Sequence, residues 1–235
     1  MCTCGAQFPL AQHSQTYTVS KEFLTTFYSA VGYLQCLEYT CVMKSICVYC
    51  GSASHASRKY FLSARRMGVT LARAGLTLIY GGGRTGLMGA LADSVLDGGG
   101  QVIGVIVESM NTPELAHTHL TRLEVTATIH QRKARMYALA DGYIALPGGY
   151  GTLDELFETL TWAQIGEHQK PVGILNVDGY FDPLLEMLDR AVTDKFLFPE
   201  HRKALQCDTD PERLLEAMTA QHYPHEASQR WMRQD

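Results

Sequence analysis

The sequence predicts a single α/β domain built on a doubly wound, Rossmann-like parallel sheet with helices on both faces. From residue 43 onward, short apolar runs of strand length alternate with longer runs of helical length. Residues 76–80 and 102–107 are apolar almost throughout, as expected of parallel strands that are buried on both faces. Two glycine-rich stretches each join a predicted strand to a predicted helix, which is where ligands bind in this architecture.

The predicted elements follow one another in a β-α-β rhythm. An apolar strand at 46–49 precedes a helix at 58–74, and the strand at 76–80 runs into the first glycine stretch. A helix at 87–97 and a strand at 102–107 follow. After a long loop through Pro113, we expect a strand at 123–125, a helix at 129–140, a strand at 143–146, a helix at 153–165, a strand at 172–176, and helices at 180–193 and 212–219.

The composition excludes several classes of protein. A hydrophobic fraction of 46% and a charged fraction of 19% are typical of a soluble globular chain. A net charge of −4 argues against a protein that binds a nucleic-acid backbone. The most apolar early stretch, 27–43, is broken by Gln35 and Glu38 and is too short to span a membrane, and the first twenty residues lack a secretory signal. We therefore expect a cytoplasmic protein that binds neither nucleic acid nor membrane.

Seven cysteines, an odd number, argue against a complete disulfide framework. The pairs Cys2–Cys4 and Cys47–Cys50 have no second pair at zinc-ligand spacing, so we expect no metal site. A redox role for Cys47–Cys50 is also disfavoured, because Cys50 is followed by a glycine at a strand end rather than by a helix. Reduced, buried thiols are the simplest interpretation.

The first glycine stretch, residues 81–89, offers backbone amides and a helix N-terminus to an anion such as phosphate. Gly81, Gly83 and Gly86 also satisfy the dinucleotide-binding pattern, and Glu108 stands 22 positions after Gly86, where a ribose-binding acid is expected. At this point a nucleotide phosphate site, a nicotinamide-dependent oxidoreductase and purely structural turn glycines all remain open.

The second glycine stretch, residues 147–155, adds reactive side chains. We expect Thr152 to cap the following helix, and Glu155 lies at capping-box spacing from it. The alternative is that the Glu155 carboxylate contacts sugar hydroxyls or water beside the bound anion. A basic cluster at the start of the helix at 129–140 lies between the two stretches; helical spacing places Arg132 and Arg135 on one face and Lys133 elsewhere.

These motifs resemble the Lonely Guy family of cytokinin riboside 5′-monophosphate phosphoribohydrolases, which are often labelled lysine decarboxylases. The similarity runs from about Lys44 to Leu205. It is carried by the residues of 47–52, 81–89, 130–134, 147–155 and 161–164, and above all by an Arg-Lys-Ala helix start followed by Pro-Gly-Gly-x-Gly-Thr-x-x-Glu. A pyridoxal-dependent decarboxylase needs a Schiff-base lysine, and the only lysine within the motifs is Lys133, so we set that activity aside.

The resemblance implies hydrolysis of N6-modified adenosine 5′-monophosphates to a free cytokinin base and ribose 5-phosphate, by a homodimer without a cofactor. By motif position, Arg132 and Glu155 would be catalytic. The substrate pocket would be formed by Ser52, Gly82, Gly83, Glu114, Lys133, Gly148, Gly149, Tyr150, Gly151, Thr152, Leu153, Asp154 and Thr161. Asp154 replaces the glutamate of many members, and Ile129 replaces a methionine, which would alter the base pocket.

The extent of the resemblance suggests a domain organisation, and two alternative functions remain beside the one it implies. Residues 1–42 would be an N-terminal extension of unknown role, with Met43 as a possible true start. Residues 43–207 would form the nucleotide-binding catalytic domain, and 208–235 a C-terminal helix and tail. A general AMP or nucleotide 5′-monophosphate nucleosidase and a non-catalytic molybdenum-cofactor carrier remain alternative functions.

Overall fold

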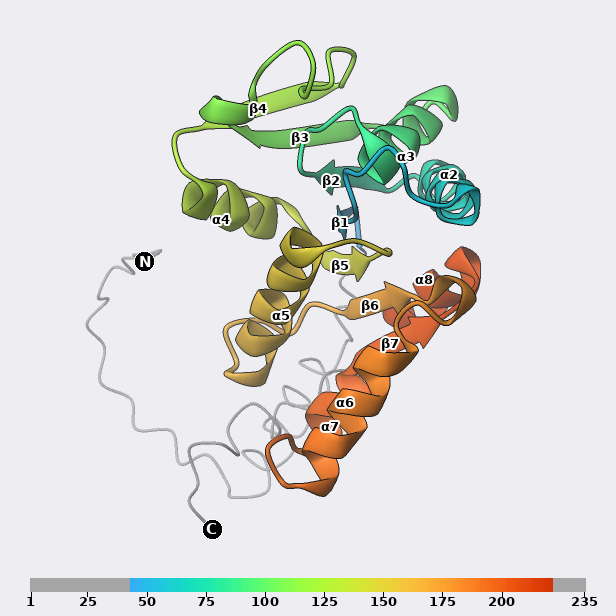
Figure 1. Cartoon of the computed structure of the whole chain (residues 1–235), viewed down its shortest axis with the longest axis vertical. Helices are drawn as coiled ribbons and strands as arrows, with labels where there is room; N and C mark the ends of the chain where they lie inside the picture. Colours follow the sequence, from blue (N-terminus) through green and yellow to red (C-terminus); the bar gives the residue numbers. More distant parts are fainter. Residues whose placement is uncertain (1–42, 222–235) are drawn as a thin grey trace, which may run out of the picture. The chain divides into compact units, whose positions relative to one another are not determined.

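A computed structural model describes residues 43–221, which contain one seven-stranded parallel sheet (Figure 1). The strands lie side by side in the order β4-β3-β2-β1-β5-β6-β7. Their bounds are β1 (Ser45–Tyr49), β2 (Thr77–Tyr80), β3 (Val102–Val107), β4 (Arg122–Thr126), β5 (Gly142–Ala145), β6 (Val172–Leu175) and β7 (Leu205–Asp208). This confirms the predicted doubly wound, Rossmann-like sheet.

The strand order contains one switch point, between β1 and β5. The chain leaves β1 toward β2, β3 and β4 on one side, then returns to place β5 against the other side of β1. Tyr49 at the end of β1 pairs with Ala145 at the end of β5, so both strands finish at the same level. The loops that follow diverge in opposite directions and leave a crevice between them, the usual ligand position in open α/β sheets.

Helices cover both faces of the sheet. One apolar cluster joins the sheet to α2 (Arg58–Arg73), α3 (Gly86–Asp97) and α8 (Pro211–Ala220). The other joins it to α4 (Ile129–Leu139), α5 (Tyr150–Gln164) and α6 (Asp182–Thr193). The short α7 (Pro199–Ala204) and the 3₁₀ turns η1 (Glu108–Met110) and η2 (Val177–Gly179) complete the described elements.

The central strand β1 is buried along its whole length. Ile46 and Val48 face the cluster of α2, α3 and α8, whereas Cys47 and Tyr49 face that of α4, α5 and α6. Cys50 follows the end of β1 and packs in the first cluster. The alternation follows from the two-residue period of a strand and explains why this run is apolar throughout.

Two elements, α7 and β7, were not predicted. The β7 segment Leu205–Asp208 alternates apolar and polar residues over only four positions, which is too short to distinguish from a loop. Helix α5 begins at Tyr150, three residues before the predicted start, because the Gly149 backbone is extended and ends the preceding loop. The predictions about residues 1–42 and the tail after residue 221 lie outside the described residues.

Candidate active site

The loops at the carboxyl ends of β1, β2 and β5 pack directly on one another. The Gly51 amide donates to the Pro147 carbonyl (3.1 Å), and the Leu87 amide donates to the Gly51 carbonyl (2.9 Å). Gly86 has a φ of +60°, and a Cβ on it would lie 2.4 Å from the backbone carbon of Ser52. Glycine at this position is therefore required by both conformation and space. These contacts bring both predicted glycine stretches to the switch point.

A cavity of about 480 Å³ opens between these loops. This volume lies within the range of small-molecule sites. Eight of the predicted site residues line it: Ser52, Gly83, Arg132, Gly149, Tyr150, Gly151, Thr152 and Glu155. The cavity thus unites residues that are more than a hundred positions apart in the chain, such as Ser52 and Glu155.

Arg132 and Glu155 meet in this cavity. Arg132 Nη1 donates to Glu155 Oε1 at 2.9 Å, and each side chain is only 13% exposed. Arg132 Nε also donates to the Val105 carbonyl at 2.9 Å, which anchors the guanidinium to the end of β3. The guanidinium has five N–H donors, so these two contacts leave others for a ligand. The pair is held from two helices and one strand.

The environment of Glu155 favours the protonated form more than water does. Burial raises the pKa of the Glu155 carboxyl, and the neighbouring Arg132 opposes this shift without cancelling it. The nearby side chains of Cys47 and Tyr49 in β1 and of Cys50 just after it are themselves buried, and the pKa of each is raised by that burial. A carboxyl with a raised pKa in a cavity is a typical general acid-base group.

The N-terminus of α5 opens on the same cavity. Gly149 is its N-cap residue, and no side chain caps it. The prediction that Thr152 is the cap was wrong, because Thr152 lies buried within the first turn. Glu155 therefore stands in the second turn and has no capping-box role. The first amides of a helix lack intrahelical acceptors, so this terminus is suited to bind an anion.

The first glycine stretch is more fully occupied by protein contacts. The Arg84 amide donates to the Leu115 carbonyl (2.8 Å), and the His117 amide donates to the Gly82 carbonyl (2.9 Å). The Leu87 amide is bound by Gly51, as described above. This stretch therefore braces the loop at residues 112–117, and its Arg84 and Leu87 amides are bound within the protein.

Comparison with known proteins decides the family. A family model described as "Possible lysine decarboxylase" matches residues 88–218. The Oryza sativa subsp. japonica protein named cytokinin riboside 5′-monophosphate phosphoribohydrolase LOG is 47% identical over 162 residues, covering 69% of this chain and 67% of that protein. The Arabidopsis thaliana protein named cytokinin riboside 5′-monophosphate phosphoribohydrolase LOG7 is 46% identical, covering 69% of this chain and 75% of that protein. The chain belongs to the Lonely Guy family.

A solved structure supports the fold of this Lonely Guy protein. The molybdenum cofactor binding protein from Rippkaea orientalis superposes with a TM-score of 0.59 over 76% of this chain and 98% of that one. The two sequences are 24% identical, so the similarity concerns the fold alone.

The basic cluster of α4 does not act as one group. Arg135 is paired with Glu124 of β4 (Nε to Oε2, 2.6 Å), away from Arg132. Lys133 Nζ is held by Asp154 and Glu158 of α5, each at 3.0 Å. Arg132 and Lys133 thus both contact α5 while Arg135 contacts β4, which differs from the predicted grouping of Arg132 with Arg135. Lys133, the only lysine of the motifs, is committed to two carboxylates.

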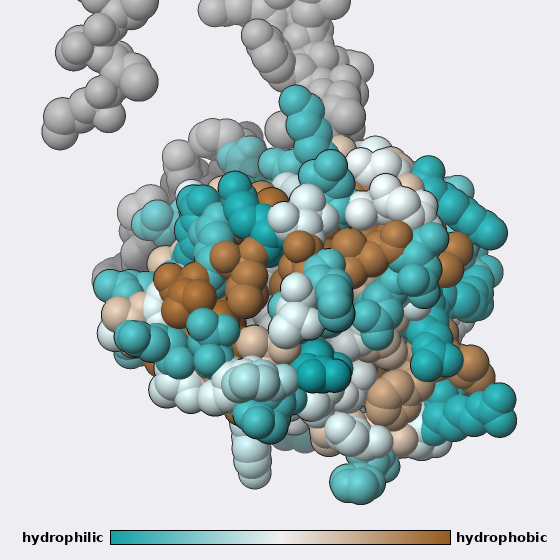
Figure 2. Space-filling model, turned by 90° about the horizontal axis from the view of Figure 1, so that it is seen from above, coloured by the Kyte–Doolittle hydropathy of each residue, from teal (hydrophilic) through white to brown (hydrophobic). Residues whose placement is uncertain are grey.

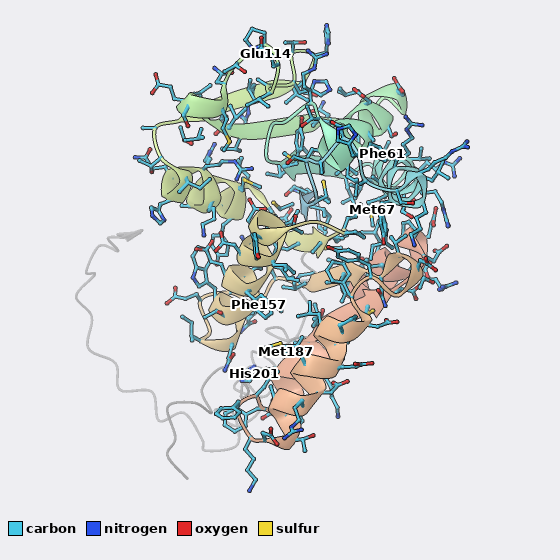
Figure 3. All side chains as sticks on the ribbon, viewed as in Figure 1. Phe61, Met67, Glu114, Phe157, Met187 and His201 are labelled. Carbon is cyan, nitrogen blue, oxygen red and sulfur yellow. The ribbon has the colours of Figure 1, made fainter. Side chains whose placement is uncertain are left out.

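Several residues assigned by resemblance lie outside the walls of the cavity. Glu114 is exposed on the loop between β3 and β4 (Figure 3), next to Leu115, which does line the cavity. Thr161 lines a separate cavity of about 120 Å³ between α5 and α7, together with Phe157 and His201 (Figure 3). Gly82, Lys133, Gly148, Leu153 and Asp154 also lie outside the lining.

The remaining wall of the cavity is apolar, and of its residues the sequence identified Ile129 alone. Figure 2 shows a band of hydrophobic residues across the face on the β4 side of the domain. Met110, Leu115 and Ile129 are each more than 40% exposed although they line the cavity. Met88 and Ile106 continue this wall inward. These residues come from separate segments, so no local pattern unites them.

Residues 43–221 contain neither a metal-ligand cluster nor a membrane-crossing helix. No group of three His, Cys, Asp or Glu side chains in this region is placed to hold a metal ion. Within the same residues, no helix is both long enough and apolar enough to cross a membrane.

Proposed function

We propose that this protein hydrolyses the N-glycosidic bond of N6-modified adenosine 5′-monophosphates, releasing a cytokinin base and ribose 5-phosphate. The observation that carries the proposal is the buried Arg132–Glu155 pair beside the uncapped start of α5. It places an acid-base group next to an anion site, which is what cleavage of a nucleotide requires. The names of the relatives at 46–47% identity support the same reaction.

In the proposed mechanism, Glu155 acts as a carboxylate on the sugar. It stabilises positive charge that develops at C1′ and takes a proton from the attacking water. The water oxygen bonds to C1′, and the base nitrogen departs with the electron pair of the broken bond and accepts a proton, which balances the proton that Glu155 takes from water. Because Glu155 is buried and its pKa is raised, it is a stronger base than an exposed glutamate.

The anion site and the guanidinium would hold the rest of the nucleotide. The amides of Tyr150, Gly151 and Thr152 at the start of α5 would bind the 5′-phosphate, with the Ser52 hydroxyl beside them. Arg132 would contact the phosphate or sugar oxygens through donors not used by Glu155 and Val105. Fixing the phosphate positions C1′ over the carboxylate, which lowers the entropic cost of the reaction.

The apolar wall would receive the base. Met88, Ile106 and Ile129 present hydrocarbon surface, and Met110 and Leu115 extend it to the cavity mouth. Burial of an apolar N6 substituent against such a surface stabilises the complex in proportion to the area removed from water. This arrangement favours a hydrophobic N6-modified base over plain adenine.

The setting of the reaction belongs to the same proposal. Hydrolysis with these residues requires water as the only second reactant, so we propose that no cofactor takes part. We also propose that the protein acts in the cytoplasm as a homodimer. Gel filtration with light scattering, which would give about twice the chain mass of 26.1 kDa for a dimer, tests the oligomeric state.

The decisive experiment measures base release by chromatography. Purified protein is incubated with N6-isopentenyl-AMP, AMP, GMP and CMP, alongside the variants Glu155→Gln and Glu167→Gln. Glu167 is an exposed residue just beyond α5 and serves as the matched control. We expect release of isopentenyladenine above all other bases, a loss of about a hundredfold or more in Glu155→Gln with nucleotide binding largely intact, and normal activity in Glu167→Gln.

Other outcomes point to the alternative functions. Equal release from AMP and the N6-modified nucleotide would indicate a general nucleosidase. No release from any nucleotide, together with purification of a bound pterin, would indicate a cofactor carrier. A thermal shift with a nicotinamide cofactor would favour the oxidoreductase, since a ligand at a hundred times its Kd stabilises by about 2.7 kcal/mol.

A further inference from the structure

Lys133 joins α4 to α5 immediately beside the proposed catalytic pair. Its Nζ lies 3.0 Å from Asp154 Oδ2 and 3.0 Å from Glu158 Oε1, and its side chain is 12% exposed. Lys133 follows Arg132 on α4, and Asp154 precedes Glu155 on α5. The helix pair is therefore bridged at adjacent positions by two sets of ionic contacts.

A second contact between α4 and α5 lies about one helical turn further along both helices. The Tyr137 ring meets the Trp162 ring edge-on, with centroids 4.6 Å apart. Tyr137 lies four residues after Lys133, and Trp162 lies four after Glu158, so each pair occupies one face of its helix. The Lys133 bridge and the aromatic contact fix both the distance and the register of α4 against α5.

The local charge and space around Lys133 disfavour a substrate contact. One ammonium faces two carboxylates, so the group of three carries a net charge of −1 and does not attract a phosphate. Lys133 lines only a narrow crevice with no room for a water molecule, between Tyr137, Glu158 and Trp162. It is absent from the walls of the 480 Å³ cavity.

We propose that Lys133 is a positioning residue that clamps α5 to α4 and so holds Glu155 in register with Arg132. This inference rests on the proposed function of that pair. It departs from the substrate-binding role that the resemblance implies. The reason register matters is that Arg132 is anchored to β3 while Glu155 is carried by α5 alone, so any slip of α5 separates the carboxylate from the guanidinium.

The clamp also contributes to the electrostatics of Glu155. The groups that face its carboxyl are Arg132 and Lys133 from α4, Asp154 from α5, Cys47 and Tyr49 from β1, and Cys50 just after β1. Lys133 and Arg132 lower the Glu155 pKa, whereas burial and Asp154 raise it. Removal of the Lys133 charge leaves Asp154 less compensated, so the pKa of Glu155 should rise further.

The test compares Lys133→Met with Lys133→Arg, which retains the charge. Three quantities are measured: kcat and KM for base release, the pH profile of kcat/KM, and the Kd for AMP. We expect kcat to fall about 10- to 100-fold in Lys133→Met, as for a catalytic group displaced by about an ångström. The acidic limb of the profile should move to higher pH, and the Kd for AMP should change little. Lys133→Arg should recover most of kcat and the wild-type pH profile.

Three results would contradict the proposed positioning role of Lys133. A tenfold or larger rise in KM and in the Kd for AMP with unchanged kcat would make Lys133 a substrate contact. A lower melting temperature with unchanged kcat and pH profile would make its role purely structural. Failure of Lys133→Arg to recover activity would show that the positive charge at this position is not what holds Glu155 in place. If the wild-type protein binds AMP but releases no base, the proposed function is refuted instead. The Kd for AMP of the Lys133 variants would still show whether Lys133 contacts the ligand.

Discussion

Arg132 Nη2 lies so close to Gly81 that a Cβ built on this glycine would be only 2.0 Å from it. The guanidinium cannot simply move aside, because Val105 and Glu155 hold its other nitrogens. Gly81 is therefore needed for the space it leaves rather than for an unusual backbone angle.

Gly81→Ala should displace the guanidinium from Glu155. Because the catalytic pair would lose its geometry, we expect kcat for base release to fall about a hundredfold. The same Cβ would approach the Met88 methyl at 2.7 Å. The double variant Gly81→Ala/Met88→Ala relieves that contact alone, so recovery of activity in the double variant would show that Met88, and not Arg132, is the group displaced.

The acidic limb of the pH profile should reflect Glu155. Its pKa is raised by burial, and only the carboxylate can take a proton from water. Activity should therefore be lost as pH falls through a value above the usual glutamate range. The substrate phosphate also titrates, near pH 6. The pH dependence of AMP binding is measured in parallel, and a limb that coincides with it would assign the loss to the phosphate instead.

Tyr180 should stabilise the second glycine stretch from the opposite side. Its hydroxyl donates to the Gly148 carbonyl at 2.6 Å, and its ring meets Tyr60 edge-on at 5.6 Å. Tyr180→Phe removes the hydrogen bond but keeps the ring, at a cost of about 1 kcal/mol. We expect KM for the nucleotide to rise several-fold. Tyr60→Phe is the matched control, and an equal effect in both variants would contradict a role for the Gly148 contact.

The sequence predicted the sheet better than the site. Short apolar runs such as that of β3 are typical of buried parallel strands, and the glycines mark where they end. The same glycines could not reveal that α5 begins at Tyr150, because the helix start depends on the extended backbone of Gly149 within a run of glycines that can adopt many conformations. The sequence predicted Arg132 and Glu155 individually, yet their 2.9 Å contact depends on how α4 and α5 pack. Apart from Ile129, the residues of the apolar wall could not be predicted, because they come from separate segments.

Thr128 should stabilise the first turn of α4, which carries Arg132. Its hydroxyl accepts a hydrogen bond from the Gln131 amide (3.2 Å), and Gln131 Oε1 accepts one from the Ala127 amide (3.2 Å). Thr128→Ala should lower the free energy of unfolding by about 1 kcal/mol, the usual cost of a lost N-cap. Thr128→Ser keeps the acceptor and should unfold as the wild type does. Urea titration measures both, and equal midpoints for Ala and Ser would exclude a capping contribution.

Ile129 should determine how strongly the enzyme prefers an N6-modified base. It is the first residue of α4, is 43% exposed, and forms part of the apolar wall. Ile129→Ala removes hydrocarbon surface without harming the helix, since alanine is the better helix former. We expect the ratio of kcat/KM for N6-isopentenyl-AMP to that for AMP to fall about three- to tenfold, the lower end of what a pocket contact of this kind provides, because Ile129 is only partly buried.

Val125→Ala is the matched control for Ile129→Ala. Val125 is also branched and 48% exposed, yet it does not line the cavity, so its loss should leave the ratio unchanged. If the ratio stays constant in Ile129→Ala as well, the N6 group does not bind against this part of the wall. A fall in both kcat/KM values by the same factor would mean instead that Ile129 positions the whole nucleotide, because a contact with the substituent cannot affect a substrate that lacks it.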